Sequence, residues 1–382
     1  MQWLASQGII LTNSYASMSL MPISHAHTHI PVSHPSQPNY IASVSGETFG
    51  LQNDNDYNIP SFIATVVDLL DTRNISWAQY LEDYPGDPTK STQDLYVRSH
   101  NPLASYQSVS GNSTRAANFK SFVDFDSDLS SRRLPQWMVV VPNTRNDGHD
   151  TGLAFGAQWL RGWLEPLLKD EYFFNETLIV VTFDEAEPED VVNHIDTVIL
   201  GGAVPPSARG TTTTMYFNHY SALSTVSVNW DLPSLGRWDC AANVFPPVAD
   251  KVNYTNTDIV YGNMKWDVSY PGPLNRDAET LPGFWPYPET VAHCAANKGV
   301  LPAVIDHWGR STGTYNYTSV YPYNNGFSQS MGTVPAIGVN DVGDSPTDET
   351  PANEGSGPLR VMSVFDVSLM LCGVALMHIL FG

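Results

Sequence analysis

The sequence predicts an α/β protein whose sheet is mostly parallel, with helices on both faces. Two short apolar runs, 135–141 and 177–183, have the length and the β-branched content of strands that are buried on both sides. The segment 153–168 between them has helical periodicity. Strand, helix and strand therefore form a βαβ unit, which places parallel strands in one sheet. A further run, 195–200, ends at two glycines and predicts one more strand.

The segment around Ser36 predicts the amino end of a helix. Pro38 suits a first helical turn, an apolar stretch follows, and Gly46 provides a stop. Ser36 therefore lies at or just before the helix start. There the helix dipole and the free N–H groups favour an anion, although an ordinary N-cap serine fits the same pattern. Other helices are expected at 2–7, 59–70 and 219–229, and a short strand at 9–11.

Length and charge limit the possible functions. The 382 residues suffice for one large α/β domain or two smaller ones. With 39 acidic and 18 basic residues, the formal net charge is −21. Such a surface repels nucleic acid and anionic membranes, and it suits an extracellular or acidic compartment. An anionic substrate would need a local cation in order to bind.

Two adjacent carboxylates, Asp184 and Glu185, follow the apolar run 177–183 directly. Open parallel sheets bind ligands at the carboxyl ends of their strands, and paired carboxylates suit a hard or borderline divalent cation. A metal here would supply the missing positive charge. A solvated acidic turn is the alternative, because Glu187 and Glu189 come soon after.

The order of these features resembles the fungal secreted acid phosphatases of the phosphoesterase family. That family includes bacterial phospholipases C and belongs to the alkaline phosphatase superfamily. The resemblance covers about residues 2–275 and is carried by the following segments: HPSQPNYIASVSGETFG, YVRSHNPL, LPQW, NDGHDT, TLIVVTFDE, ILGGAVP, NHYSALSTVSVNWDLPSLGRWDC and YPGPL. It implies an alkaline-phosphatase-like fold and hydrolysis of phosphate esters.

The resemblance also implies roles for residues of the first motifs. Ser36 takes the place of a metal-bound nucleophile, and Asn39 would hold a phosphoryl oxygen. Asp184 and Glu185 match the carboxylates that bind the divalent metal together with Ser36. The expected protein is an extracellular, metal-dependent acid phosphatase that acts on phosphate monoesters. The alternatives are a phospholipase C-type phosphodiesterase and a catalytically dead surface glycoprotein.

Three histidines complete the implied site. His149 lies in the NDGHD loop and His100 in the RSHNP loop, and both match active-site histidines of the family. A protonated imidazole can give the leaving group its proton at acid pH. His219 is implied as an outer ligand or only as a helix start.

The catalytic segment departs from the family pattern in two places near its amino end. In the family a secretion signal and a first strand, ending in a Glu-Asn pair that completes the metal site, precede the position where Met1 falls here. The expected fold therefore lacks that amino-terminal strand, which is the reason for the dead-glycoprotein alternative. Residues 17–31, with their alternating histidines, interrupt a segment that is short in the family and are expected to be an insertion.

Two of the three cysteines, Cys240 and Cys294, lie outside the apolar tail. A disulfide between them is expected, and a pair of buried free thiols is the alternative. The sequence also permits glycosylation, at Asn74, Asn112, Asn175, Asn253 and Asn316.

The carboxyl end is expected to lie outside the catalytic domain of 1–320. Residues 321–360 are acidic and of low complexity, as in a disordered stalk. Residues 361–382 form an apolar tail that fits the signal for a glycosylphosphatidylinositol anchor, which would be the only contact with a membrane. A spanning helix is the alternative, although Asp366 would be costly inside a bilayer.

Overall fold

The computed structural model describes ten segments of the chain: 2–16, 35–51, 53–175, 177–186, 193–258, 272–274, 285–286, 288–290, 293–309 and the backbone of 371–380. The expected insertion at 17–31 is described nowhere, and the expected stalk at 321–360 also lies outside these segments.

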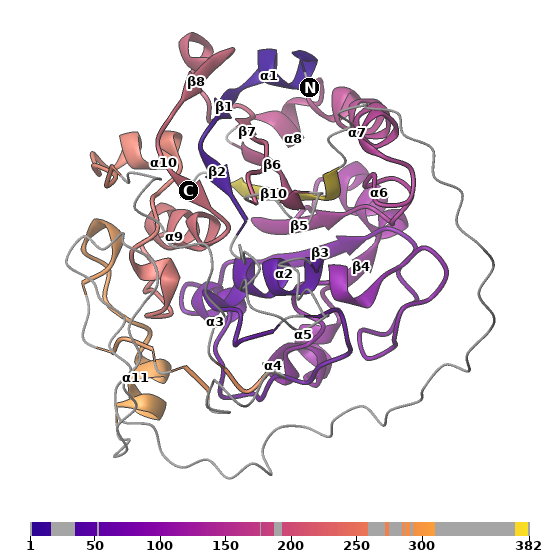
Figure 1. Ribbon diagram of the computed structural model, residues 1–382. Helices are drawn as coiled ribbons and strands as arrows, with labels where there is room; N and C mark the ends of the chain where they lie inside the picture. Colours follow the sequence, from indigo (N-terminus) through magenta and orange to yellow (C-terminus); the bar gives the residue numbers. More distant parts are fainter. Residues whose placement is uncertain are drawn as a thin grey trace, which may run out of the picture.

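An eight-stranded sheet forms the centre of the described structure, in the order β4-β3-β5-β10-β6-β7-β1-β8 (Figure 1). Its strands are β1 (Ile9–Leu11), β3 (Trp77–Leu81), β4 (Phe119–Ser121), β5 (Trp137–Val141), β6 (Thr177–Ala186), β7 (Thr197–Leu200), β8 (Thr211–Thr213) and β10 (Leu371–Leu380). A separate parallel pair joins β2 (Ser14–Tyr15) to β9 (Phe217–Asn218).

The sheet is mixed in its pairings. β3 is parallel to both β4 and β5, and β1 is parallel to β8. β10 is antiparallel to β5 and β6, so those two strands run in the same direction on either side of it. β7 is antiparallel to β6 and to β1. Consequently the carboxyl ends of β3, β5 and β6 meet at one edge of the sheet.

Helices cover both faces of the sheet, as predicted. Along β5, Val139 and Val141 pack into one core while Met138 and Val140 pack into the other, because successive side chains of a strand point to opposite faces. The first core includes α2 (Ser36–Ser45), α3 (Val66–Asp71), α9 (Tyr220–Asn229) and α10 (Pro246–Lys251). The second includes α6 (Phe122–Ser130), α7 (Leu153–Leu167) and α8 (Glu171–Phe174).

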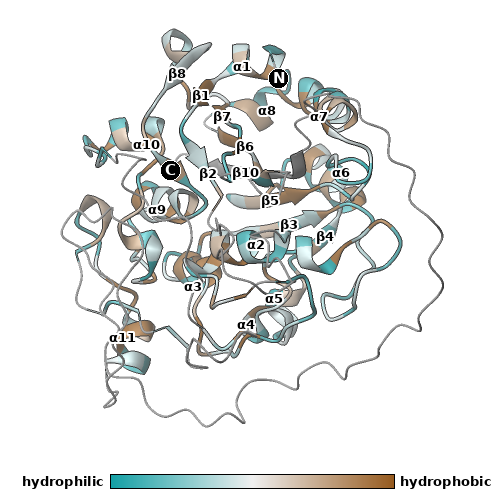
Figure 2. Ribbon diagram, in the orientation of Figure 1, coloured by the Kyte–Doolittle hydropathy of each residue, from teal (hydrophilic) through white to brown (hydrophobic). Residues whose placement is uncertain are grey.

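Figure 2 shows the hydrophobic colour concentrated in β5, β6 and β7, between helices whose outer faces are more polar. The α/β class with parallel strands and flanking helices is thereby confirmed. The remaining helices are α1 (Gln2–Gln7), α4 (Gln107–Ser110), α5 (Ser113–Ala116) and α11 (Pro302–Trp308), and the short 3-10 helices include η1 (Arg98–His100) and η3 (Trp238–Cys240).

The helix expected at 59–70 begins later than the apolar pattern predicts. Thr65 and Asp68 form a capping box, in which the Thr65 hydroxyl accepts the N–H of Val67 at 3.3 Å and the Asp68 carboxylate accepts that of Thr65 at 2.8 Å. Before this cap, Ile59 forms a bridge with Tyr106. The prediction was wrong for 59–65, because these apolar residues are buried by a turn and a bridge instead of a helix face.

The predictions for the cysteine pair and for the apolar carboxyl-terminal tail have different outcomes. Cys240 and Cys294 form a disulfide with an S–S distance of 2.03 Å, so that prediction is confirmed. Of the expected anchor signal at 361–382, only the backbone of 371–380 is described, and it forms β10 in the middle of the sheet. Among the described residues, no helix is long and apolar enough to cross a membrane. The anchor therefore stays a prediction.

Candidate active site

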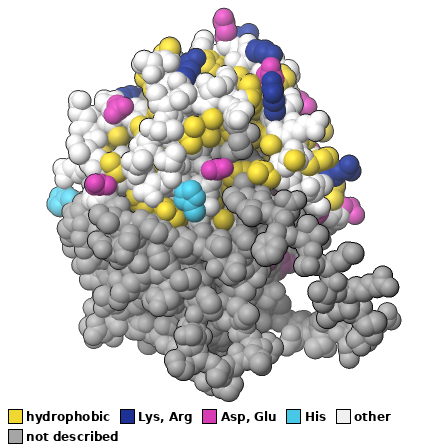
Figure 3. All heavy atoms as spheres, turned by 45° about the horizontal axis from the view of Figure 1, so that its top comes forward, with side chains coloured by type: hydrophobic (Ala, Val, Ile, Leu, Met, Phe, Trp, Pro, Cys, Tyr) yellow, Lys and Arg dark blue, Asp and Glu magenta, His cyan; other side chains and the backbone are white. Residues whose placement is uncertain are grey.

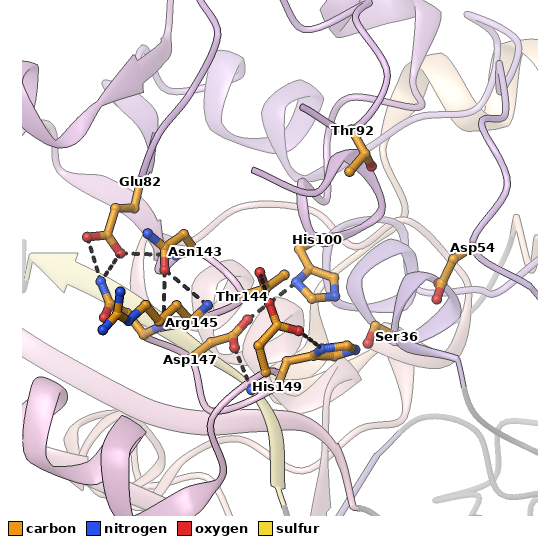
Figure 4. A network of polar contacts seen from close by, with 12 residues as sticks. Ser36, Asp54, Glu82, Thr92, His100, Asn143, Thr144, Arg145, Asp147 and His149 are labelled. Atoms are coloured by element: carbon orange, nitrogen blue, oxygen red, sulfur yellow. Dashed lines mark hydrogen bonds and ion pairs between the residues drawn. The ribbon is translucent and has the colours of Figure 1, made fainter. Parts of the chain in front are cut away.

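Ser36, His100 and His149 lie close to one another (Figure 4), and Ser36 and His219 contact Glu185 and Asp184 of β6. Ser36 is the first residue of α2, after Pro35 in an extended conformation, and Gly46 ends the helix with φ of 76°. Ser36 is buried, and its hydroxyl donates a hydrogen bond of 3.0 Å to Oε1 of Glu185. Asn39 lies one turn further along α2 and is also buried. The serine and the carboxylate pair, 149 residues apart, are thus in contact.

Asp184 and Glu185 lie inside β6 and not in a turn after it, and both are buried. Neither carboxylate oxygen of Asp184 has a hydrogen-bond partner among the described residues. Burial raises the pKa of Asp184 well above its ordinary value, and the charge of Glu185 raises it further. The solvated acidic turn is therefore not what the sequence forms at these two positions.

The three oxygen groups of Ser36, Asp184 and Glu185 fit a divalent cation. A buried carboxylate without a partner is unfavourable unless it is neutralised or coordinates a metal. The residues that line a cavity beside it include Asn39, Asp184 and His219. Among the described residues, no cluster of three or more His, Cys, Asp or Glu side chains has a metal-binding arrangement. These three groups would thus be part of a coordination shell.

His100 and His149 lie next to each other, with ring centroids 6.0 Å apart. His100 is buried, stacks on Tyr40 at 5.3 Å, and its Nδ1 lies 3.5 Å from Oδ2 of Asp147. His149 is half-exposed, and its Nδ1 lies 2.8 Å from Oδ1 of Asp150. An ionised carboxylate can only accept, so Nδ1 of His149 carries the proton and Nε2 is left for acid–base chemistry. Figure 4 shows both imidazoles on the side where Ser36 lies.

His219 has a different environment from the other two histidines. It precedes the first residue of α9 and is buried, and its Nε2 donates to the backbone oxygen of Asp184 at 2.6 Å. Burial lowers the pKa of His219 to about 4. The side chain is therefore neutral at mildly acid pH, and it holds the end of β6 rather than supplying a proton.

Asp54 belongs to the site although no sequence pattern singles it out. Its carboxylate accepts the backbone N–H of Gln37 at 2.9 Å, next to Ser36. The residue as a whole is exposed, yet the loops around its carboxyl remove enough water to raise the pKa, and Glu185 raises it further. The Gln37 N–H and the nearby His100 lower it. No local pattern indicates this contact, because a polar loop separates Asp54 from α2.

Glu82, directly after β3, also supports the site. It accepts two hydrogen bonds from Nδ2 of Asn146, at 2.8 and 2.9 Å, and one from the backbone of Asn143 at 3.0 Å. These bonds fix the loop after β5, which carries Asp147 and His149. The only signal for Glu82 was its acidic neighbour Asp83, because the strand before them, β3, has no distinctive sequence pattern.

The described part of the face in Figure 3 shows no counterpart to this concentration of polar groups. Acidic, basic and apolar side chains are intermingled on the described part of the face in Figure 3. At the site, by contrast, the carboxyls of Asp54, Asp147, Asp184 and Glu185 lie close enough to repel one another, so an anionic ligand would be repelled unless a cation accompanies it.

Comparison with known proteins agrees with this geometry. Residues 24–233, more than half of the chain, match the phosphoesterase family. The chain is 45% identical over 333 residues to an acid phosphatase of Aspergillus fumigatus. The aligned segment covers 85% of this chain and 71% of that protein. It is 40% identical over 327 residues to a phosphate-repressible acid phosphatase of Penicillium chrysogenum, covering 84% and 75%. It is 31% identical over 240 residues to a phosphatidylinositol-3-phosphatase of Mycobacterium tuberculosis, covering 62% and 72%.

These matches show that the chain belongs to the phosphoesterase family, and by class it is a phosphoric ester hydrolase. The family match spans Ser36, His100, His149, Asp184, Glu185 and His219.

Proposed function

We propose that this protein is an extracellular acid phosphatase that hydrolyses phosphate monoesters, with Ser36 as nucleophile and a divalent metal as cofactor. The observation that carries the proposal is the contact between the Ser36 hydroxyl and Glu185, beside the unpartnered carboxylate of Asp184. The acid phosphatases to which the chain is similar support the reaction class. The net charge of −21 suits an acidic medium, where part of it is neutralised.

The first step is attack by the Ser36 hydroxyl on phosphorus. Its proton passes to Oε1 of Glu185, which already accepts it at 3.0 Å. A bond forms from the Ser36 oxygen to phosphorus while the bond to the leaving alcohol breaks. A divalent ion held by Ser36, Asp184 and Glu185 would neutralise charge on the phosphoryl oxygens and favour the serine alkoxide.

The second step restores the enzyme. In its imidazolium form, His149 gives the proton on Nε2 to the departing alkoxide, which leaves as the alcohol, and Asp150 keeps the ring oriented through Nδ1. Water then attacks the phosphoserine, and His149 accepts a proton from it at Nε2. The bond between the Ser36 oxygen and phosphorus breaks, Glu185 returns its proton to that oxygen, and inorganic phosphate leaves. Asn39, on the same helix as Ser36, would hold a phosphoryl oxygen through its amide.

Ser36→Ala tests the nucleophile. Turnover of an aryl phosphate at acid pH should fall to background, while the circular dichroism spectrum stays that of the wild type. The matched control is Ser45→Ala on the same helix, since Ser45 is equally buried but its hydroxyl donates to Ile41 at 3.0 Å, away from the site. Activity of Ser36→Ala within a few-fold of wild type would refute the assignment.

Replacement of both Asp184 and Glu185 by alanine tests the metal. Elemental analysis of the purified variant should show loss of the bound divalent ion, whereas Asp126→Ala, at an exposed position on α6, should keep it. Unchanged metal content would contradict the proposed ligands.

The same preparations distinguish the alternatives. A phospholipase C-type enzyme would prefer a phosphodiester with a lipid headgroup over the aryl monoester. A catalytically dead glycoprotein would turn over neither substrate, with or without added metal.

A further inference from the structure

We propose that Asp54 is a positioning residue for the nucleophile, and this inference depends on the proposed function of Ser36. Its carboxylate caps the amino end of α2 from outside the helix and so fixes the orientation of Ser36. The contact that carries the inference is the 2.9 Å hydrogen bond from the backbone N–H of Gln37 to Oδ1 of Asp54.

The helix has no cap of its own. The first four N–H groups of a helix lack partners within it, and a side chain at the N-cap position usually accepts one of them. Here the N-cap is Pro35, which makes no side-chain cap bond. Asp54 supplies the acceptor instead, from a loop 17 residues along the chain. A carboxylate at this end of a helix is also favoured by the helix dipole.

The loop that carries Asp54 is itself held in place. Both the backbone N–H of Asn55 and the hydroxyl of Tyr57 donate to Oδ1 of Asn53, at 3.1 and 2.8 Å. Asp56 forms an ion pair of 3.2 Å with Arg98, which is buried and donates further to the backbone of Tyr57. The Asp54 carboxylate is therefore presented by a fixed turn.

This loop connects two parts of the site. On one side Asp54 holds the first turn of α2, and on the other Asp56 holds Arg98, which begins the turn η1 that ends at His100. Loss of the Asp54 contact would release the first turn of α2 while η1 keeps its ion pair. We therefore expect the distance between Ser36 and its histidines to vary in the absence of Asp54.

Two substitutions separate the hydrogen bond from the charge. Asp54→Ala removes the acceptor, and kcat for an aryl phosphate should fall about tenfold, the size expected from losing one cap, with KM changed less than about threefold. Asp54→Asn keeps an oxygen acceptor without the charge and should restore kcat to within about threefold of the wild type. Hydrogen exchange of the Gln37 amide should be faster in Asp54→Ala and near normal in Asp54→Asn.

Asp170→Ala is the matched control, because Asp170 caps α8 by accepting the N–H of Tyr172 at 2.9 Å, on the face of the sheet opposite α2. It should lower the melting temperature and leave kcat unchanged. An unchanged kcat in Asp54→Ala, a lower KM in that variant, or an Asn variant as slow as the Ala variant would each overturn the inference.

The two proposals can fail separately. If wild type and Ser36→Ala are equally inactive, the proposed function fails. The exchange of the Gln37 amide still decides whether Asp54 caps α2, because that measurement needs no turnover. An exchange rate unaffected by Asp54→Ala would refute the capping role by itself.

Discussion

The disulfide between Cys240 and Cys294 should contribute about 4 kcal/mol to the free energy of unfolding. The two residues are 54 positions apart. In the chain-entropy model, closing a loop of that length in the unfolded chain costs about 14 cal/mol/K, which is about 4 kcal/mol at 25 °C. The bridge joins the end of η3 to a segment before α11, and both cysteines are buried in the larger core.

Urea unfolding of the double variant Cys240→Ala, Cys294→Ala measures this contribution. The midpoint should shift to lower urea, and the m-value should be higher than that of the oxidised wild type, because the unfolded chain without the bridge exposes more surface. Wild-type protein unfolded in a reducing buffer is the control for the loss of the two sulfur atoms from the core. If the free energies of unfolding of oxidised and reduced wild type differ by less than about 1 kcal/mol, the reasoning is refuted, because the bridge would then not constrain the unfolded chain.

Three further predictions concern the site and the tail. In metal-free buffer with a chelator, Asp184→Asn should raise the melting temperature by about 2–4 °C at neutral pH, because the substitution removes a buried unpaired charge. This gain should disappear below about pH 4, where the carboxyl is protonated in the unfolded chain too. A melting temperature below that of the wild type at neutral pH would contradict the prediction. The pKa of His219 is about 6.5 in the unfolded chain and about 4 in the folded protein, so the free energy of unfolding should fall by up to about 3 kcal/mol as pH drops through that range. Urea titrations of His219→Gln should lack this part of the pH dependence. For the anchor, a phosphatidylinositol-specific phospholipase should release the protein from intact cells, and a cell-bound protein whose carboxyl-terminal peptide still contains Cys372 would show the anchor prediction to be wrong.

The sequence by itself determined the parts of the fold that depend on local pattern. The apolar runs that became β5 and β6 and the helix α7 between them were predictable, because burial on both faces and helical periodicity leave a direct trace in the order of residues. The start of α2 at Ser36 and its end at Gly46 follow from proline and glycine chemistry. The pair Asp184 and Glu185 was found because two carboxylates after an apolar run are unusual.

Only the tertiary structure decided which strands pair and in which direction. β3 is five residues long and was not predicted, since its sequence has no distinctive pattern, and β10 comes from the far end of the chain to lie between β5 and β6. Strand order depends on contacts between distant segments, which no local window contains. The helix expected at 59–70 begins late for a related reason, because the bridge from Ile59 to Tyr106 competes with helix formation.

The same division holds within the site. Residue types and motif order pointed to Ser36, the carboxylates and the histidines, but not to their distances. That Glu185 accepts from Ser36, that His219 bonds to a backbone oxygen, and that Asp54 caps α2 are consequences of the fold. A hydrogen bond depends on position and direction within a few tenths of an ångström, and that geometry is set by the packing of the whole domain rather than by any stretch of the sequence.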